Sequence, residues 1–429
     1  MQFKYIRIKS LFGLYNYNID FFHKEEDKLT ILTGPNGYGK TTVLTILDNL
    51  SPESLYYFYL LKYETIEIGL SDETYMLIDQ SFSEKKDEEK DKTSDTKQAS
   101  VKEVRFSWLD KDNVLLSYFL YNDNVIRKAK RNAGFYHRFM IESLEKNVNN
   151  TDNGLLKNKR FNEYIAHDIG QDIFLMQLES LRTKFIHANR IYNEANEEND
   201  VLPIQKIRQT LQKELSMAYQ NYLQQSQRID SQFIKRVISK EKTTISEQEY
   251  NQLAEKVIQK RDELFYFRLT DNISIPPYDK DDSFILYNYI KGLGEKYANY
   301  GNWTEKLNLF NKLLKTKRFA QKSITFSPQH GFQIISVNGD ILNESLLSSG
   351  EQNEIILLFR LIFEVSDNSV LLIDEPENSL HVVWQQKFLD DIQEIAKTKN
   401  LQVIVSTHSI SIVARGQDNA IDLYYLQKK

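Results

Sequence analysis

The most informative segment of this chain is LTILTGPNGYGKTTVLTIL, residues 29–47. Its first residues, with Leu29, Ile31 and Leu32, form an apolar run that is typical of a β-strand. Glycines follow, and apolar residues then recur at helical spacing up to Leu47. The sequence therefore predicts a strand, a loop and a helix in direct succession. The loop matches the pattern GxxxxGK[ST] over 34–41, which in this context binds the phosphates of a nucleotide.

Each residue type in this loop has a chemical role. Glycines allow consecutive backbone N–H groups to point inward at a phosphate chain, and the helix start adds partial positive charge. Lys40 can reach the β- and γ-phosphates, and the Thr41 hydroxyl can ligate Mg²⁺. The alternative is a glycine turn that merely precedes a helix, and the strand before the loop argues against it. The predicted nucleotide-binding residues of the loop are Gly34, Pro35, Asn36, Gly37, Tyr38, Gly39, Lys40, Thr41 and Thr42.

Composition narrows the class of protein. The 429 residues, 41% of them hydrophobic, with 24 Phe and 25 Tyr, are enough for two or three compact units with a sizeable core. The net charge of −5 predicts no overall attraction to nucleic acid. The absence of cysteine excludes disulfides, thiolate metal sites and a cysteine nucleophile, and is compatible with a reducing cytoplasm. No stretch approaches the roughly 20 apolar residues that cross a bilayer, so we expect a soluble, cytoplasmic protein without a membrane partner.

The spacing of apolar residues along the sequence divides the chain into three predicted domains. Residues 1–200 hold the phosphate loop and strands that suggest an antiparallel β subdomain over the nucleotide site. Residues 201–304 carry apolar residues at three- and four-residue intervals, which predicts at least two helices with a turn near 228–246, the first helix of about 23 residues. Residues 305–429 alternate strands with helices, as βαβ units around a parallel sheet do. Individual predicted elements include strands 2–9, 15–21, 63–70, 74–79, 101–108, 114–120, 184–188 and 421–426, and helices 350–365 and 380–397.

Two charged segments leave alternatives open. Residues 83–98 lack apolar side chains, which predicts a solvated hairpin tip or a segment that folds on binding a partner. Residues 127–138 carry five Lys or Arg, with Phe135 and Tyr136 between them. They would suit the phosphates and bases of a nucleic acid, or form an amphipathic helix with a solvated basic face.

The sequence VLLIDEPE, residues 370–377, places carboxylates at the end of a buried strand. Four apolar residues precede Asp374 and Glu375, the order expected for a central strand that delivers charge at its carboxyl edge. Asp374 could hold Mg²⁺ opposite Thr41, directly or through water. Glu375 could orient and deprotonate an attacking water. A DE pair alone is more often an ordinary strand end, but the phosphate loop elsewhere in the chain favours the catalytic interpretation.

Two further segments complete the set of candidate motifs. LSSGEQ precedes a helix, so that Ser348, Ser349 and the Gly350 amide form a second helix start, suited to an anion or serving only as an N-cap. IVSTHSI places His408 just past an apolar strand. There its imidazole could contact a γ-phosphate or have a purely structural role.

In the order phosphate loop, LSSGEQ, LLIDEPE and STHS, the four motifs resemble those of the ABC-class ATPase head, particularly the group containing RecF, the SMC proteins and the OLD-type ATPases. The resemblance covers about 1–125 and 305–429. It implies an α/β fold, with a mixed core sheet, flanking helices, an antiparallel β subdomain and a helical insertion that forms a short arm or bundle. It also implies ATP and Mg²⁺ as cofactors, and hydrolysis of ATP to ADP and phosphate.

In the family that this chain resembles, two heads pair head-to-tail and sandwich two ATP molecules. The resemblance therefore implies a homodimer or a higher even oligomer, in which Ser348, Ser349, Gly350 and Glu351 of one chain act on the ATP held by another. Ser349 stands where transporters usually have glycine, and Glu351 follows Gly350. Both features are similar to the non-transporter branch of the family.

The resemblance also implies roles for single residues. Residues 378–381 look like the loop that communicates between the two ATP sites, and His408 looks like the switch histidine. The glutamine loop has two candidates, Gln177 and the HANR segment at 187–190. The catalytic residues implied are Glu375, His408 and Lys40, and the metal-binding residues are Thr41 and Asp374.

A second resemblance, in the helical insertion and the FIHANR segment, is to the small ATPases of bacterial defence operons, such as the ATPase subunits of the Septu and PARIS anti-phage systems. OLD proteins carry a TOPRIM nuclease after the ATPase, whereas this chain ends at Lys429. Our first hypothesis is thus an ATP-switched dimer that senses a phage or DNA signal and controls a separate effector, a nuclease. The alternatives are a RecF-like or SMC-like DNA-repair ATPase that binds DNA without an effector, and the ATP-binding subunit of a membrane transporter.

Overall fold

The computed structural model of the chain describes residues 1–21, 28–52, 54–84, 100–122, 169–187, 202–238, 244–316, 322–378, 380 and 382–427. Contacts divide it into two compact units. Unit 1 comprises Met1–Asn189 and Val365–Lys429, and unit 2 comprises Arg190–Glu364. Both ends of the chain therefore contribute to unit 1, as expected for a head interrupted by an insertion.

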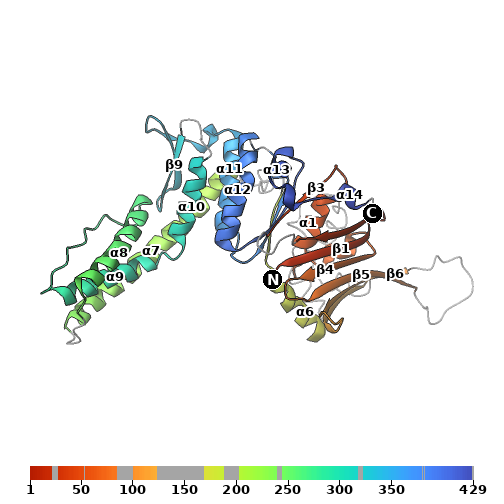
Figure 1. Cartoon of the computed structure of the whole chain (residues 1–429), viewed down its shortest axis with the longest axis horizontal. Coiled ribbons are helices and arrows are strands. Elements are labelled where there is room, and N and C mark those ends of the chain that lie inside the picture. Colours follow the sequence, from red (N-terminus) through yellow and green to blue (C-terminus); the bar gives the residue numbers. More distant parts are fainter. Residues whose placement is uncertain are drawn as a thin grey trace, which may run out of the picture. The chain divides into compact units, whose positions relative to one another are not determined.

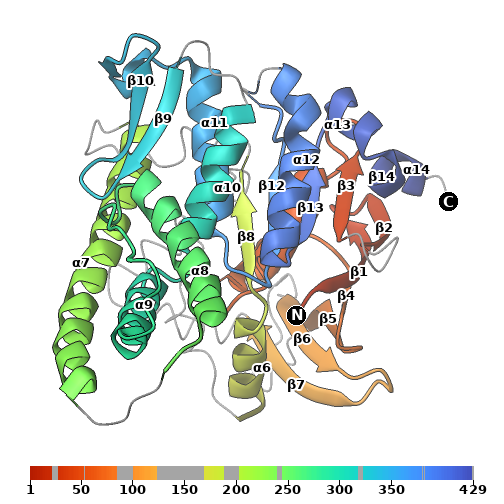
Figure 2. The same ribbon diagram turned by 60° about the vertical axis from the view of Figure 1, so that its left-hand side comes forward.

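Unit 1 is built on a five-stranded parallel sheet with the order β14–β3–β13–β12–β8 (Figure 2). Every residue of β12 and β13 is buried, which explains why these strands are nearly continuous apolar runs in the sequence. The five strands are β3 (Leu29–Thr33), β8 (Thr183–Ile186), β12 (Val370–Asp374), β13 (Gln402–Ser406) and β14 (Ala420–Asp422).

The strand order brings three of the predicted motifs to one edge of this sheet. β13 lies between β3 and β12, and its Val405 is paired with Ile31 on one side and with Ile373 on the other. Because the strands are parallel, the loops that follow them all emerge at the carboxyl edge. The loop after β3 leads into α1 (Lys40–Asp48), so the predicted succession of strand, loop and helix is confirmed.

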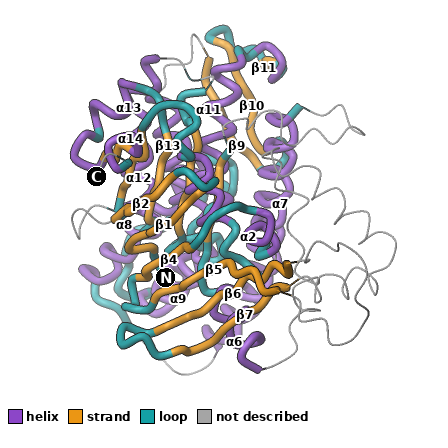
Figure 3. Tube along the Cα trace, turned by 90° about the vertical axis from the view of Figure 1, so that its right-hand side faces the viewer, coloured by secondary structure: helices purple, strands orange, loops and turns teal. Residues whose placement is uncertain are grey.

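The second sheet of unit 1 is antiparallel, with the order β2–β1–β4–β5–β6–β7 (Figure 1). It contains all six strands predicted before and after the phosphate loop. One face is buried, and the helix α6 (Ile169–Glu179) lies beside β7 (Figure 3). The Phe174 ring of α6 is 6.0 Å from the Trp108 ring of β6. The strands are β1 (Phe3–Leu11), β2 (Tyr15–Asp20), β4 (Thr65–Leu70), β5 (Tyr75–Glu84), β6 (Ser100–Leu109) and β7 (Leu115–Asn122).

The two charged segments fall almost entirely outside the described residues. Strands β5 and β6 pair in antiparallel fashion up to Glu84 and Ser100, so they are the two arms of the predicted hairpin. Residues 85–98 and 127–138 lie outside the part of the chain that the structure describes. The alternatives for these two segments therefore stay predictions.

The remaining helices of unit 1 are short, except for the one that follows β12. The prediction of a strand over 421–426 is wrong beyond Asp422. There the Asp422 side chain accepts a hydrogen bond from the Tyr424 N–H at 2.9 Å and so caps a helical turn. The helices are α2 (Tyr56–Leu60), α12 (Val382–Lys399), α13 (Ile410–Arg415) and α14 (Leu423–Leu426).

Unit 2 is mainly helical. Its longest helix, α7 (Pro203–Ile238), has 36 residues, so the predicted first helix of about 23 residues is too short. The segment 228–238 stays helical because it contains no Gly or Pro, and because Asp230 and Arg236 form ion pairs with Lys296 and Glu295 of α9. The other helices are α8 (Glu247–Tyr266), α9 (Ser283–Ala298), α10 (Trp303–Thr316), α11 (Ser349–Phe359) and a π-helical turn at Arg360–Glu364.

A small antiparallel sheet completes unit 2, with the order β11–β10–β9. Its strands are β9 (Lys322–Ser327), β10 (Gly331–Ser336) and β11 (Ile341–Leu342). Strand β10 and helix α11 both pack against α7, so residues 305–364 group with the helical segment. The predicted division at 304/305 had grouped them with the last strands of the chain. The predicted α/β class, with an antiparallel β subdomain and a helical insertion, is confirmed. The core sheet, expected to be mixed, is parallel in all its described strand pairs, because helices or long connections separate its strands along the chain. No described helix is both long enough and apolar enough to cross a membrane.

The turn between β9 and β10 depends on a glycine. Gly331 has φ +67°, and a Cβ there would lie 2.3 Å from the Arg208 carbonyl oxygen and 2.9 Å from the Gln212 nitrogen, both in the backbone of α7. We expect Gly331→Ala to lower the free energy of unfolding by about 3 kcal/mol, through backbone strain and overpacking. Urea denaturation of the purified variant and wild-type chains measures this difference in unfolding free energy.

The matched control is Gly294→Ala in α9. A Cβ at Gly294 would meet only Val257 Cγ2 at an ordinary 3.8 Å. Because alanine favours the helix, this variant should be as stable as the wild type or more stable by up to about 1 kcal/mol. If both variants had the same urea midpoint, the close approach at Gly331 would not matter for stability.

Candidate functional site

The phosphate loop owes its shape to three glycines. Gly34, Gly37 and Gly39 have φ angles of +139°, +85° and +75°, a region that other residues rarely adopt. Gly39 is also the N-cap of α1, in the left-handed conformation. The sequence folds here as a loop that wraps around the start of a helix, and this leaves backbone N–H groups available for phosphate oxygens.

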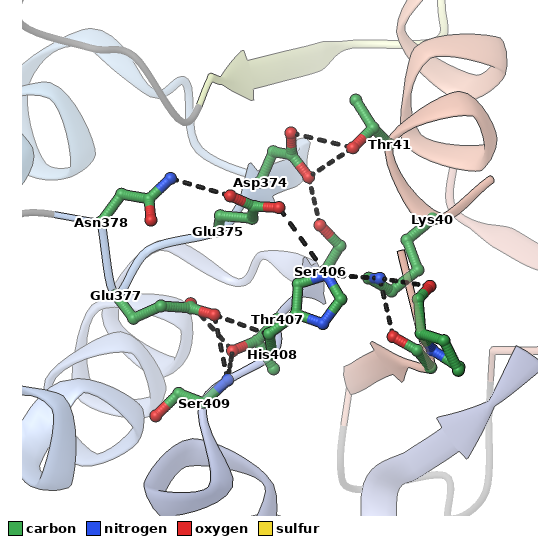
Figure 4. A network of polar contacts seen from close by, with 12 residues as sticks. Lys40, Thr41, Asp374, Glu375, Glu377, Asn378, Ser406, Thr407, His408 and Ser409 are labelled. Atoms are coloured by element: carbon green, nitrogen blue, oxygen red, sulfur yellow. Dashed lines mark hydrogen bonds and ion pairs between the residues drawn. The ribbon is translucent and has the colours of Figure 1, made fainter. Parts of the chain in front are cut away.

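Lys40 is buried and directed at its own loop. Its Nζ donates hydrogen bonds to the carbonyl oxygens of Gly34 at 2.8 Å and Pro35 at 3.2 Å, and it lies 2.7 Å from His408 Nε2 (Figure 4). Burial lowers the pKa of Lys40, and the carboxylates of Glu375 and Asp374 oppose that shift. An ammonium group can only donate, so in a hydrogen bond from Lys40 Nζ the His408 Nε2 atom is the acceptor.

Thr41 and Asp374 meet as predicted for a magnesium site. The Thr41 hydroxyl lies 3.1 Å from both carboxylate oxygens of Asp374, and the Ser406 hydroxyl also donates to Asp374. Burial raises the pKa of Asp374, although the hydrogen bonds from Ser406 and Thr41 act in the opposite direction. One hydroxyl and one carboxylate fit Mg²⁺, which takes few protein ligands and completes its shell with water and phosphate.

Glu375 occupies a strained position next to this pair. Its φ is +42°, which is uncommon for a residue with a side chain, and its N–H donates to the Ser406 carbonyl oxygen at 2.9 Å. Its carboxylate accepts a hydrogen bond from Asn378 Nδ2 at 2.8 Å and lies 3.8 Å from His408 Nε2. The side chain is about one-third exposed, so water can reach it.

Five predicted residues therefore converge at the carboxyl edge of the parallel sheet. Three neighbouring strands position them, because α1 follows β3, the DEPE segment follows β12, and His408 follows β13. The convergent residues are Lys40, Thr41, Asp374, Glu375 and His408.

Two polar residues in this cluster were not predicted from the sequence. Ser406 donates to Asp374, and Glu377 accepts from the segment Thr407–Ser409. Ser406 could have been suspected, since it ends an apolar strand directly before the histidine motif. The role of Glu377 depends on a contact with residues 30 or more positions away, for which the sequence holds no local signal.

The predicted signature residues belong to unit 2. Ser348 is the N-cap of α11, and it forms a capping box in which its hydroxyl accepts from the Glu351 N–H while Glu351 accepts from the Ser348 N–H. Burial alone would raise the pKa of Glu351, but hydrogen bonds from Lys322 and Ser348 outweigh it, and the pKa is lowered. The second helix start is therefore real, and the role of Ser348, Ser349, Gly350 and Glu351 toward a nucleotide stays a prediction.

The two candidates for the glutamine loop lie in different places. Gln177 is part of α6, where its side-chain oxygen accepts a hydrogen bond from Ser117 of β7. The HANR segment directly follows β8, the strand next to β12, so it emerges at the edge that carries the site. Of that segment the structure describes His187, while residues 188–190 lie outside the described part. Strand position thus favours the HANR segment.

Comparison with known proteins gives a family match along most of the chain. The model of the AAA ATPase domain family matches residues 1–413. Among curated proteins, the oligopeptide transport ATP-binding protein OppD of Lactococcus lactis is 33% identical over 78 residues, 18% of this chain and 22% of OppD. The zinc import ATP-binding protein ZnuC of a Wolbachia species is 24% identical over 115 residues, 27% of this chain and 43% of ZnuC. The matched stretches thus span less than half of these relatives.

Among solved structures, the chain is similar to the Smc head domain with an extended coiled coil bound to the C-terminal domain of ScpA, from Pyrococcus furiosus. The sequence identity is 13%, the TM-score is 0.39, and the match covers 98% of this chain and 92% of that one. The family match and the curated relatives support the predicted ATPase class.

The raised pKa of Asp374 leads to a prediction about stability and pH. A carboxyl group whose pKa is higher in the folded than in the unfolded protein favours folding at low pH, and this contribution is lost as pH rises through the folded pKa. We expect Asp374→Asn, without Mg²⁺, to raise the urea midpoint at about pH 7.5 and to have little effect at about pH 4.5.

The reference for this comparison is the wild-type chain with Mg²⁺ added. Mg²⁺ should stabilise the wild type at about pH 7.5 and leave the Asn variant unchanged, because a ligand stabilises only the protein that binds it. An equal shift of the Asn variant at both pH values would show that the charge of Asp374 is not the cause.

Proposed function

We propose that this chain, which belongs to the AAA ATPase domain family, is an ABC-class ATPase that binds ATP with Mg²⁺ and hydrolyses it to ADP and phosphate. The observation that carries the proposal is the convergence of Lys40, Thr41, Asp374, Glu375 and His408 at one edge of the parallel sheet. An ammonium, a hydroxyl–carboxylate pair and a second carboxylate are the groups that phosphoryl transfer to water requires.

The residues of the chain have separate tasks in this reaction. Lys40 exchanges the carbonyl oxygens of Gly34 and Pro35 for oxygens of the phosphate chain, while Thr41 and Asp374 would hold Mg²⁺. Mg²⁺ supplies Lewis-acid stabilisation of the charge on the phosphate oxygens.

Glu375 is suited to act on the attacking water. It takes the water proton as the oxygen attacks the γ-phosphorus and the bond to the β-phosphate oxygen breaks, with ADP as the leaving group. His408 Nε2 lies between Lys40 and Glu375, at 2.7 Å and 3.8 Å, and so is placed to contact the γ-phosphate. After proton transfer to Glu375, release of that proton to solvent restores the site.

We further propose that two chains complete the site head-to-tail. In this arrangement the start of α11, with Ser348, Ser349, Gly350 and Glu351, faces the ATP of a second chain. The proposal is supported by the capping box at Ser348, which holds the first-turn N–H groups of α11 at a helix N-terminus. The finer role, as the ATP-switched regulator of a separate effector nuclease in cytoplasmic anti-phage defence, is supported by the resemblance of the motif order and the helical insertion to such ATPases.

Substitution of the general base tests the hydrolytic function. Glu375→Gln keeps the size of the side chain and removes its basicity, so kcat for ATP should fall by about 10² to 10⁴. ATP should stay bound, and the elution volume in size-exclusion chromatography should move to that of a dimer. Phosphate release and the nucleotide content of the purified variant provide the measurements. A wild-type protein that releases no phosphate from Mg–ATP would refute the proposal.

Mixing two inactive variants tests the composite site. Lys40→Ala removes the phosphate ligand, and Gly350→Asp places a carboxylate in the first turn of α11, where it suits the helix dipole but repels a γ-phosphate. Each variant alone should be inactive. A mixture should regain activity, because a mixed dimer contains one site with an intact Lys40 and an intact Gly350. No recovery, with dimers present, would show that each chain acts on its own ATP.

A further inference from the structure

The carboxylate of Glu377 is fully engaged with the segment that carries His408. Its Oε1 accepts hydrogen bonds from the backbone N–H groups of His408 at 2.6 Å and Ser409 at 3.0 Å (Figure 4). Its Oε2 accepts a hydrogen bond from the Thr407 hydroxyl at 2.8 Å. Three donors from three consecutive residues therefore converge on one side chain.

These contacts fix the part of the chain from which the imidazole projects. Before it, the Thr407 N–H donates to the Leu32 carbonyl oxygen at 3.1 Å, which ends the pairing of β13 with β3. After it, the Ser409 hydroxyl donates to Gln385 of α12 at 2.9 Å. His408 itself is about one-third exposed, so a loosened backbone would let its ring turn toward solvent and away from Lys40.

The same short segment also orients the general base. Glu377 and Asn378 are neighbours, and Asn378 donates to the Glu375 carboxylate at 2.8 Å. The turn is closed by hydrogen bonds from the Asn378 N–H to the Glu375 carbonyl at 3.1 Å and from the Leu380 N–H to the Glu377 carbonyl at 3.0 Å. Adjacent residues of one turn thus hold Glu375 and the backbone of His408.

The geometry distinguishes two roles that a carboxylate could have here. A general base or metal ligand needs a free lone pair directed at the reacting groups, whereas both oxygens of Glu377 already accept charge-assisted hydrogen bonds. Hydrogen bonds of this kind typically fix the orientation of a neighbouring functional group.

We propose that Glu377 is a positioning residue of the ATPase site, and that it holds the Thr407–Ser409 segment so that the His408 ring lies between Lys40 and Glu375. The inference rests on the proposed ATPase function for its effect on turnover. It also concerns the ring of His408 in the protein without nucleotide, so it can be tested separately.

Glu377→Ala and Glu377→Gln separate hydrogen bonding from charge. The alanine variant loses all three contacts, and kcat should fall by about 10- to 100-fold while ATP affinity changes less than about threefold. The glutamine variant can still accept from both N–H groups through its oxygen and donate to the Thr407 hydroxyl through its nitrogen. Its kcat should stay within about threefold of the wild type.

Two further variants control this comparison. Asp390→Ala removes an exposed carboxylate of α12 that pairs with Arg415 of α13 but does not contact the Thr407–Ser409 segment, and its kcat should be unchanged. Thr407→Val removes one of the three hydrogen bonds with little change of shape, and should lower kcat less than Glu377→Ala does. If the alanine variant does not fold, Thr407→Val and Glu377→Gln decide the question.

The ring nitrogens of His408 provide a readout that does not depend on hydrolysis. In ¹⁵N-histidine-labelled protein, assigned with His408→Gln, the ring shifts should indicate an Nδ1–H tautomer in the wild type and in Glu377→Gln. In Glu377→Ala they should move toward the tautomer mixture of a solvent-exposed histidine.

The outcomes separate the two proposals. An alanine variant with wild-type kcat and wild-type ring shifts would overturn the positioning role, as would a glutamine variant as inactive as the alanine one. A wild-type protein without ATPase activity would refute the proposed function alone, and the ring shifts would still decide whether Glu377 orients His408.

Discussion

The position of β13 between β3 and β12 is the constraint on which the candidate site depends. Backbone hydrogen bonds of a parallel sheet fix both the neighbours of a strand and its register, and so set Ser406 opposite Asp374. Two residues later, His408 lies 2.7 Å from Lys40 on one side and 3.8 Å from Glu375 on the other. One more strand between them would add about 4.8 Å, beyond the reach of a hydrogen bond. The order of the strands therefore sets the distances between the polar side chains of the candidate site.

At the same edge of the sheet, several carboxyl groups surround the Lys40 ammonium group, so their charges do not cancel. Burial lowers the pKa of Lys40 and raises that of Asp374, so each group is less readily ionised than in water. Glu375 and Glu377 add negative charge near the Lys40 ammonium group. A triphosphate is itself strongly negative, so a divalent cation is needed to make its binding favourable. In the proposed function, Thr41 and Asp374 would hold this cation.

Two carboxylates, two residues apart, receive different tasks from their surroundings. Glu375 is partly exposed at the end of β12 and receives one side-chain hydrogen bond from Asn378, which leaves lone pairs for a water molecule. Glu377 is satisfied by three donors of the Thr407–Ser409 segment and so serves as an anchor. The sequence DEPE does not distinguish the two carboxylates, and we propose from their different contacts that Glu375 is the general base and Glu377 a positioning residue.

The elements that could be predicted from the amino-acid sequence are those that local interactions specify. The phosphate loop, the apolar strands β12 and β13, and the helix start at Ser348 were predicted because glycines, apolar runs and N-caps act over a few residues. Local signals failed where packing decides, because α7 extends to Ile238 along α9 and Asp422 starts a helical turn. The contact of Glu377 with the His408 backbone could not be predicted, because it depends on the pairing of β12 with β13, which brings together residues far apart in the chain and has no local signal in the sequence.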